Sequence, residues 1–287
     1  MLSVSSCTCL AAGRQNEMQK ICGEMTSNNK NSPRNDSYGE FYSEDFYEKQ
    51  AKESFNSAQV VLPIVFEVLP KINSAVDFGC GAGAWLSVLK SMGVNEIKGY
   101  DGSWAEKSLI IPPECFTAVE FNKETIKTDK KYDLAISLEV AEHLPERSAK
   151  MLVETITNVS DVVLFSAAIP LQGGSNHINE QWQSYWYNMF GEYGYVGTDF
   201  LRKRILNEKK VQIWYKQNII LYVKREKLKV IAIPEEHFSG KQIDFVYPEF
   251  GVAIKYWNKY DNVNVSLLGL CKLLFKRINR YILEGNI

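Results

Sequence analysis

Hydrophobic positions follow two alternating periods from residue 41 to residue 225. Short apolar runs suited to buried strands occupy residues 74–78, 96–101, 116–120, 132–138 and 161–165. Apolar residues at helical spacing separate these runs, as at Trp85, Val88 and Leu89 after the first of them. Two further alternating runs, after Tyr195 and over 211–223, predict additional strands. The succession of strands and helices predicts an α/β protein with a doubly wound, mostly parallel seven-stranded sheet.

The same pattern divides the chain into three parts. Residues 1–40 are polar and rich in turn-forming residues, so we expect a disordered segment. Residues 41–226 carry helices and then the predicted sheet, and form the main domain. Residues 227–287 form a C-terminal extension, in which proline and glycine separate short apolar stretches.

The extension ends in a predicted amphipathic basic helix over residues 266–283. One face is apolar, with Leu267, Leu274 and Ile278, and the other carries Lys272 and Lys276. Such a helix packs on its own domain or on a second copy, or it makes peripheral contact with a membrane surface. No apolar run is long enough for a transmembrane segment.

Charge and cysteine content narrow the classes of partner and compartment. The formal net charge of −1 makes nucleic acid an unlikely main partner, although RNA as a substrate stays open. The six cysteines are scattered without paired CxxC motifs, so a structural zinc site is not expected. This usage is typical of a reducing, cytoplasmic compartment.

A glycine-rich turn follows the first predicted strand and carries the most informative motif. Asp77 lies in the strand, and Gly79, Cys80, Gly81 and Gly83 form the turn before the helix that begins at Ala84. Glycines let the main chain approach a ligand closely, and the following helix N-terminus presents free N–H groups. The spacing also satisfies the dinucleotide pattern G-x-G-x-x-A, so an NAD-dependent oxidoreductase is an alternative.

Acids and histidines gather after the other predicted strands. Asp101, next to Gly102, lies 22 positions after Gly79, a spacing suited to a carboxylate that accepts both ribose hydroxyls. Glu120 ends the third strand, and Glu142 follows the fourth. Since ligands of such sheets bind at the carboxyl ends of the strands, we expect these side chains to share one site.

The D-x-G-C-G-x-G string from Asp77 to Gly83 is similar to motif I of the class I S-adenosylmethionine-dependent methyltransferases. The resemblance covers residues 41–225 and implies a Rossmann-like fold with S-adenosylmethionine as cofactor. It implies that Asp77 holds the methionine ammonium above the glycines, that Asp101 holds the ribose and that Glu120 meets the adenine. The cofactor contacts expected from it are Asp77, Gly79, Cys80, Gly81, Gly83, Asp101, Gly102, Glu120, Phe121 and Glu139. Trp104 is a further candidate to cover the adenine edge.

A second string, Glu139-x-x-Glu142-His143 with the later His177, resembles the E-x-x-E-H arrangement of ubiquinone-pathway O-methyltransferases and small-RNA 2′-O-methyltransferases. This resemblance implies that Glu139, Glu142, His143 and His177 hold a divalent metal, Mg²⁺ or a similar ion. In the alternative without metal, His143 or His177 is the catalytic base, with Glu142 beside it, because imidazole titrates near neutral pH. The remaining histidine, His237, is expected to be structural.

Taken together, these resemblances imply methyl transfer to a small-molecule hydroxyl, of the sugar or natural-product type found in a small-molecule branch of the family. The acceptor itself is not defined by the sequence, and Gln181, Trp182, Tyr185 and Trp186 are candidates to line its pocket. Besides the oxidoreductase, a non-catalytic cofactor-binding scaffold remains an alternative.

Overall fold

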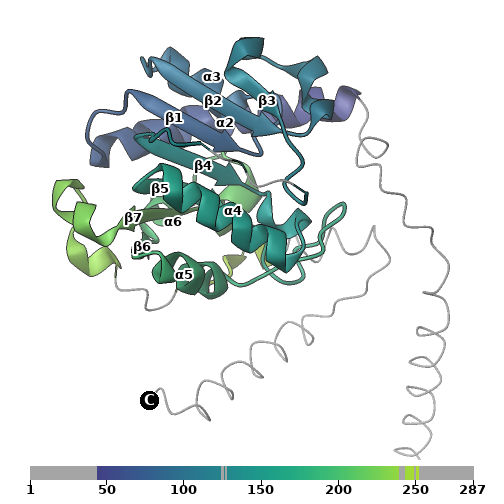
Figure 1. Cartoon of the computed structure of the whole chain (residues 1–287). Coiled ribbons are helices and arrows are strands. Elements are labelled where there is room, and N and C mark those ends of the chain that lie inside the picture. Colours follow the sequence, from purple (N-terminus) through teal and green to yellow (C-terminus); the bar gives the residue numbers. More distant parts are fainter. Residues whose placement is uncertain (1–43, 124–125, 127, 239–242, 249, 252–287) are drawn as a thin grey trace, which may run out of the picture. The chain divides into compact units, whose positions relative to one another are not determined.

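The computed structural model describes residues 44–251 apart from 124–125, 127, 239–242 and 249, and these residues form a sheet flanked by helices (Figure 1). The strands are β1 (Ser74–Phe78), β2 (Glu96–Asp101), β3 (Phe116–Ala118), β4 (Leu134–Leu138), β5 (Val162–Ser166), β6 (Tyr195–Thr198) and β7 (Ile220–Lys224). The α-helices are α2 (Glu44–Val68), α3 (Ala84–Ser91), α4 (Glu146–Val159), α5 (Gln183–Glu192), α6 (Phe200–Ile205) and α7 (Ile213–Asn218). The predicted disordered segment and the predicted basic helix lie outside the described residues.

The seven strands are ordered β3-β2-β1-β4-β5-β7-β6. β1 to β5 are parallel where they pair, while β7 is antiparallel to both β5 and β6. The predicted doubly wound, mostly parallel seven-stranded sheet is therefore confirmed. The parallel strands end at one edge of the sheet, and β7 enters the sheet from that same edge.

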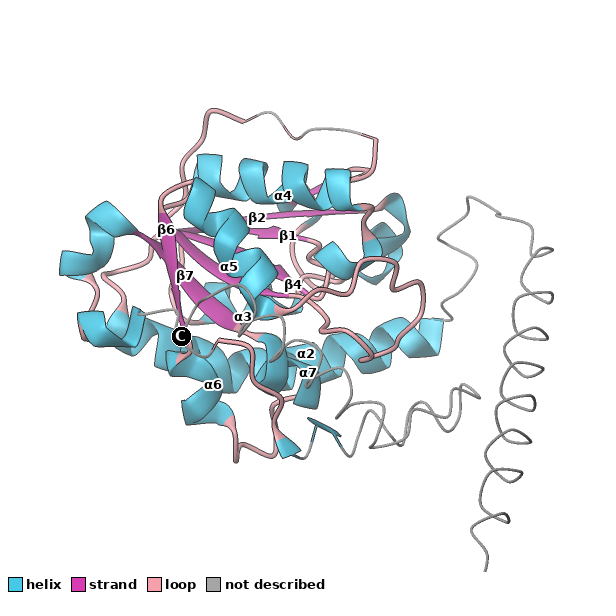
Figure 2. Ribbon diagram, turned by 90° about the horizontal axis from the view of Figure 1, so that it is seen from below, coloured by secondary structure: helices cyan, strands magenta, loops and turns pink. Residues whose placement is uncertain are grey.

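Helices cover both faces of the sheet because successive strand residues point to opposite sides. In β4 and β5, Ile136 and Leu164 join the cluster packed by α2, α3, α6 and α7, whereas Ala135 and Phe165 join the cluster packed by α4 and α5. Figure 2 shows these two sets of helices on opposite sides of the strands. Continuous apolar runs in the central strands follow from this burial on both faces.

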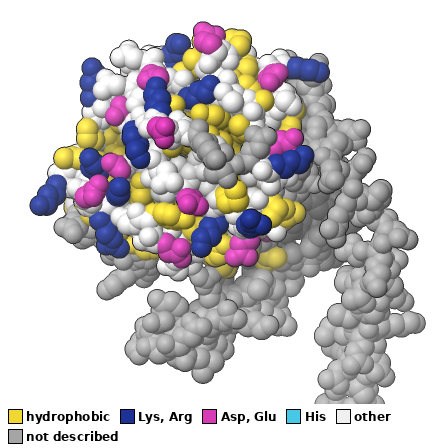
Figure 3. All heavy atoms as spheres, viewed as in Figure 1, with side chains coloured by type: hydrophobic (Ala, Val, Ile, Leu, Met, Phe, Trp, Pro, Cys, Tyr) yellow, Lys and Arg dark blue, Asp and Glu magenta, His cyan; other side chains and the backbone are white. Residues whose placement is uncertain are grey.

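The surface mixes the two signs of charge. On the face shown in Figure 3, lysine and arginine side chains are interspersed with aspartate and glutamate. This distribution agrees with the near-zero net charge of the sequence.

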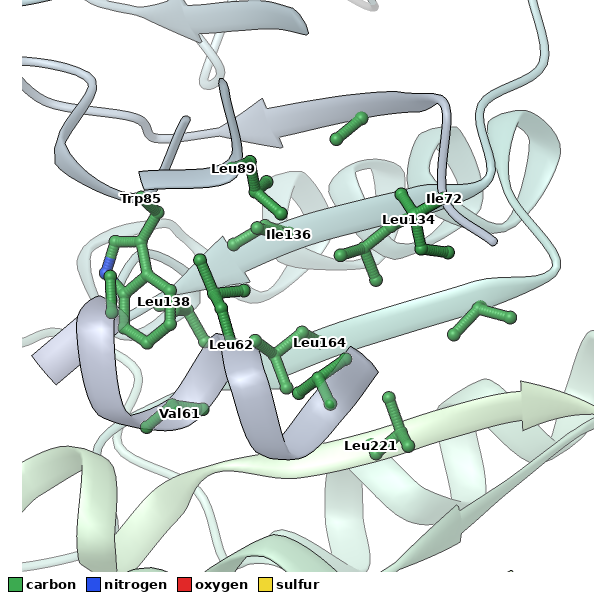
Figure 4. Packing of buried hydrophobic residues seen from close by; sticks show 14 of the residues in the cluster. Val61, Leu62, Ile72, Trp85, Leu89, Leu134, Ile136, Leu138, Leu164 and Leu221 are labelled. Atoms are coloured by element: carbon green, nitrogen blue, oxygen red, sulfur yellow. The ribbon is translucent and has the colours of Figure 1, made fainter. Parts of the chain in front are cut away.

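Helix α3 is anchored beside the carboxyl ends of the strands by Trp85 in its first turn. Trp85 is buried in the same cluster as Leu62 of α2 and Leu138 of β4 (Figure 4). Its ring meets the ring of Tyr215 edge-on, with centroids 5.3 Å apart. The packing of α2, α3 and α7 thus closes one side of the edge at which ligands of this fold class bind.

The prediction of one strand over residues 211–223 was wrong. The first half of this run is helix α7, and only Ile220–Lys224 is a strand. A short apolar run does not distinguish a strand from a buried helix, and here the packing of Tyr215 on Trp85 selects the helix. The third strand also ends earlier than expected, at Ala118.

The described part of the C-terminal extension packs on the main domain. The backbone N–H of Ala232 donates to the Val68 carbonyl at 2.8 Å. Arg202 of α6 is fully buried and donates from Nη2 to the Ile243 carbonyl at 2.8 Å and from Nη1 to the Gln217 carbonyl at 2.9 Å. Asp199 pairs with its Nε. The guanidinium therefore fastens the segment around Ile243 to α7.

Candidate functional site

The glycine turn after β1 adopts backbone conformations that side chains disfavour. Gly79, Gly81 and Gly83 have φ of 88°, 52° and 86°, all in the left-handed region. A Cβ on Gly79 would lie 2.2 Å from the Val140 side chain, and one on Gly83 would lie 2.8 Å from Ile111. A Cβ on Gly81 would have no neighbour within 4 Å, so the turn at Gly81 faces open space. The turn therefore leaves room for a ligand on this side.

Asp101 ties this turn to the end of β2. Its Oδ2 accepts the backbone N–H of Gly81 at 2.6 Å, and its Oδ1 accepts that of Gly102 at 2.7 Å. Burial raises the pKa of Asp101, and these two N–H donors act in the opposite direction. Each carboxylate oxygen keeps a further lone pair, so a ribose hydroxyl has an acceptor left on both.

Asp77 is buried in β1 at 3% exposure, below the turn. Burial and then the charge of Asp101 raise its pKa well above the ordinary value. A cationic group placed over the turn would offset both effects. The site therefore suits a ligand with a positively charged end, as an amino acid ammonium has.

The other expected cofactor contacts divide into a buried and an exposed set. Cys80 is buried, with its Sγ close enough to Gly99 to exclude a Cβ there. Trp104 lies over Gly102, where any Cβ would meet the indole ring. Glu120 is half-exposed and forms an ion pair with Lys123 at 2.6 Å. Phe121 packs against the hydrophobic cluster on the face of the sheet that α4 and α5 cover.

The E-x-x-E-H string begins immediately after β4. Glu139 has a left-handed φ of 56°, which is uncommon for a residue with a side chain, and the 3₁₀ helix η4 (Ala141–His143) follows. Ligand atoms of Glu142, His143 and His177 lie within 4.8 Å of one another. The structure thus brings together three of the four expected metal ligands, and we call these three residues the EHH cluster.

Glu142 provides a buried carboxylate in this cluster. It has 0% exposure, and neither carboxylate oxygen makes a well-formed hydrogen bond among the described residues, although the backbone N–H groups of Glu142 and Ala168 lie near. Burial and then the charge of Glu139 raise its pKa well above the ordinary value. A buried carboxylate without well-formed hydrogen bonds is costly, so this arrangement fits a bound cation.

The two imidazoles stand almost perpendicular, with ring centroids 4.8 Å apart. Burial and the neighbouring His177 lower the pKa of His143 to about 4. His143 is therefore neutral at physiological pH and keeps a nitrogen lone pair for a ligand. Neutral imidazole is the form that binds metal ions.

Glu180, which the sequence analysis missed, orients His177. The Nδ1 of His177 lies 3.0 Å from Glu180 Oε1, while the backbone N–H groups of Gly173 and Leu171 each donate to Glu180 at 2.8 Å. A carboxylate at Nδ1 leaves Nε2 as the free lone pair. The i, i+3 spacing of His177 and Glu180 was the available signal.

Glu139 lies outside the cluster that the other three residues form. Its carboxylate accepts hydrogen bonds from Asn218 and Gln172, two residues that the sequence analysis also missed. Burial raises the pKa of Glu139, and these donors and the nearby His177 act against that. No local sequence signal connects Glu139 with Asn218, because they are 79 positions apart.

The candidates for the acceptor pocket have different surroundings. Trp186 is in the core at 1% exposure, against Phe165, rather than at the surface of the site. Trp182 packs on the cluster around Ile169, and Tyr185 donates its hydroxyl proton to Glu146 at 3.0 Å. Gln181 donates to Asn179 at 3.0 Å, beside the EHH cluster. Asn179 in turn contacts the carbonyls of Ala141 and Glu142, so Gln181 is linked to the loop that carries Glu142.

The sheet order, the open glycine turn and the acids at the strand ends define an α/β enzyme that binds a nucleoside cofactor. The family described as "Methyltransferase domain" matches residues 38–198, more than half of the chain. The chain belongs to this family, and it is an S-adenosylmethionine-dependent methyltransferase. Membership of this family excludes the two alternatives raised by the sequence, an NAD-dependent oxidoreductase and a non-catalytic cofactor-binding scaffold.

Two solved structures with a TM-score of 0.50 show the same fold at low sequence identity, and a third is reported beside them. A chain from the complex of the Haloferax volcanii Trm112 methyltransferase activator with a methyltransferase has 11% identity and a TM-score of 0.50, over 67% of this chain and 99% of that one. The sugar N-methyltransferase KedS8 from Streptoalloteichus sp. ATCC 53650 has 14% identity and a TM-score of 0.50, over 68% and 97%. Human N-acetylserotonin methyltransferase in complex with S-adenosylmethionine has 15% identity and a TM-score of 0.47, over 72% and 66%. A search of curated proteins gave no match.

Among the residues that the structure describes, none of the helices combines the length and apolar character needed to cross a bilayer.

Proposed function

We propose that the protein transfers a methyl group from S-adenosylmethionine to a hydroxyl of a small molecule of the sugar or natural-product type. The observation that carries this proposal is the EHH cluster at the edge where the cofactor turn lies. Val140, which precedes Glu142 by two residues, packs directly on Gly79 of the turn. A molecule bound at the cluster is therefore next to the cofactor.

The cofactor supplies a methyl group on a cationic sulfur, which needs only a correctly placed nucleophile. In our proposal Asp77 faces the methionine ammonium, and the main chain at Gly81 lies under the methionine moiety. Asp101 accepts the ribose hydroxyls while it holds the turn in place. Trp104 and Phe121 flank the adenine, with Glu120 at its amino group.

The EHH cluster fits a divalent metal by its donor set. It offers one buried carboxylate from Glu142 and two imidazoles, a mixture that favours a transition metal over Mg²⁺. A divalent ion bound there would lower the pKa of an acceptor hydroxyl. His143 and His177 would each donate a nitrogen lone pair, and Glu180 would keep the ring of His177 in its orientation.

A metal-free mechanism is the second candidate, and one observation favours it. The contact of His177 Nδ1 with Glu180 resembles the pairing that orients a catalytic imidazole, and leaves Nε2 to take the acceptor proton. His143 is a poor base, because its pKa is about 4.

We also propose that the protein works in a reducing, cytosolic compartment. The proposed acceptor is not a nucleic acid. Cys80 and Cys115 are free thiols in the described part of the chain, as a reducing compartment favours. The mixed surface charge offers no basic stripe on the face shown in Figure 3. The C-terminal basic helix stays a prediction, either for packing or for a membrane surface.

The test is a search for the acceptor with isotopically labelled S-adenosylmethionine. The full chain is incubated with sugars, sugar nucleotides and phenolic metabolites, with Mn²⁺ and in parallel with a chelator, and products are identified by mass shift. We expect a methyl ether that forms with Mn²⁺ and is lost in chelator. Full activity in chelator supports His177 as base instead, and a product methylated on nitrogen or carbon overturns the hydroxyl acceptor.

A further inference from the structure

Two amide side chains hold the carboxylate of Glu139, and we call this pair the amide clamp. Asn218, at the end of α7, donates from Nδ2 to Glu139 Oε1 at 3.1 Å and to Oε2 at 3.2 Å. Gln172, in the loop after β5, donates from Nε2 to Glu139 Oε2 at 3.1 Å. The clamp residues are joined to each other, because Asn218 Nδ2 also lies 2.9 Å from Gln172 Oε1.

The surroundings fix which end of each amide faces Glu139. Gln172 Oε1 accepts the backbone N–H of Ile169 at 3.2 Å, so its amino group is the end left for Glu139. Asn218 Oδ1 faces Gln183 Nε2 at 3.5 Å, which places its amino group on the Glu139 side. Both residues are buried, at 1% exposure for Asn218 and 4% for Gln172. The clamp is therefore a rigid pair of N–H donors.

The backbone of Glu139 is also held in place. Its left-handed φ of 56° is a conformation that persists only where neighbours determine it. The N–H of Glu139 donates to the Ser166 carbonyl at 3.0 Å and lies 3.2 Å from the Ser166 hydroxyl. Strand β5 thus fixes the backbone of Glu139, and the clamp fixes its carboxylate.

The carboxylate that is held in this way comes from the same loop as the EHH cluster. Glu142 follows three residues later, and its carbonyl accepts the backbone N–H groups of Ile178, at 2.9 Å, and Asn179, at 3.0 Å. Two carboxylates this close repel each other unless donors or a cation offset the charge. The clamp supplies donors to Glu139 and none to Glu142.

We propose that Asn218 and Gln172 are positioning residues, which hold the Glu139 carboxylate in one place beside the EHH cluster so that a divalent ion meets a second carboxylate. This proposal rests on the metal site proposed above. The clamp comes from α7 and from the loop after β5, so two elements distant in sequence would set the affinity for the ion.

The experiment is a calorimetric titration of the full chain with Mn²⁺ alone. Asn218→Leu keeps much of the volume and removes the donors, and Gln172→Met is a second variant at the other half of the clamp. We expect each to weaken Mn²⁺ binding by about 10–100-fold, the effect typical of groups that orient metal ligands. Val163→Ala, a buried change in β5 outside the clamp, is the control for lost stability and leaves the affinity unchanged.

A double-mutant cycle with Glu139→Gln separates positioning from general damage. If Asn218 acts through Glu139, Asn218→Leu has little further effect on Mn²⁺ affinity once Glu139 is glutamine. Additive losses overturn the clamp, as does wild-type affinity in both clamp variants. Absence of Mn²⁺ binding by the wild-type chain overturns the metal site itself, and the clamp's function with it.

Discussion

The Nδ1 atom of His177 and the Oε1 atom of Glu180 are 3.0 Å apart, on the same short loop after β5. Glu180 is itself held by two backbone N–H groups, so its position does not depend on His177. The contact therefore orients the imidazole before any ligand arrives.

Replacement of Glu180 by Gln should weaken metal binding without removing a ligand. The amide keeps the shape of the side chain but loses the charge that favours a proton on Nδ1 of His177. We expect Mn²⁺ affinity to fall about tenfold. Calorimetry of the purified chain measures this, with Glu146→Gln, an exposed acid on α4, as the control. Equal affinities of the variant and the wild type would contradict the orientation argument.

Alanine at two glycines of the cofactor turn should separate folding from binding. Both positions have left-handed backbones, so each substitution carries a conformational cost of about 1–2 kcal/mol. Gly79→Ala also drives a methyl group into Val140 and should lower the unfolding free energy further, whereas Gly81→Ala meets no neighbour. We expect Gly81→Ala to fold and to lose affinity for S-adenosylhomocysteine. Thermal unfolding and calorimetry compare the two, and unimpaired binding by Gly81→Ala would show that no ligand lies over the turn.

The buried Arg202 makes the fold sensitive to its acidic partner. Asp199→Ala leaves the guanidinium without its carboxylate at a fully buried position, so the free energy of unfolding should fall by about 3–5 kcal/mol. Urea denaturation measures this. The control is Asp161→Asn, since Asp161 pairs with Lys224 and Lys227 at the surface and its loss should cost about 0–1 kcal/mol. Similar decreases in the free energy of unfolding in both variants would contradict a large cost of leaving the buried Arg202 guanidinium unpaired.

The stability of the metal-free protein should depend on pH through His143. Its pKa is about 4 in the folded chain, below the ordinary value of 6.5. Between pH 4 and pH 6.5 the unfolded chain therefore binds a proton at His143 more readily than the folded chain does. The contribution of His143 to the free energy of unfolding is thus complete above pH 6.5 and is lost as the pH falls towards 4. The total is about 3 kcal/mol or less. Urea denaturation of the wild type and His143→Gln in chelator measures the difference between them. That difference should shrink on acidification, and a constant value would refute the shifted pKa.

Features fixed by local sequence were predicted well. β1 has the predicted bounds, β2 ends at Asp101 as predicted, and Glu142, His143 and His177 meet because β4 and β5 are neighbours. Helix α7 was missed because the apolar run around Tyr215 fits either period. The hydrogen-bond donors to Glu139, Asn218 and Gln172, were missed because only tertiary packing brings them to that carboxylate. An uncharged amide carries no sequence signal for such a contact.

The reversed direction of β7 has a consequence for how such an enzyme diversifies. A strand that enters from the ligand side delivers Asn218, which lies two residues before it, to the reaction edge, although the first half of the sheet holds the cofactor motif. In the function proposed above, substrate preference and metal affinity are in this way separable from nucleoside recognition. If so, exchange of the segment from β6 to β7 between relatives is a route to new acceptors that leaves the machinery for the methyl donor intact.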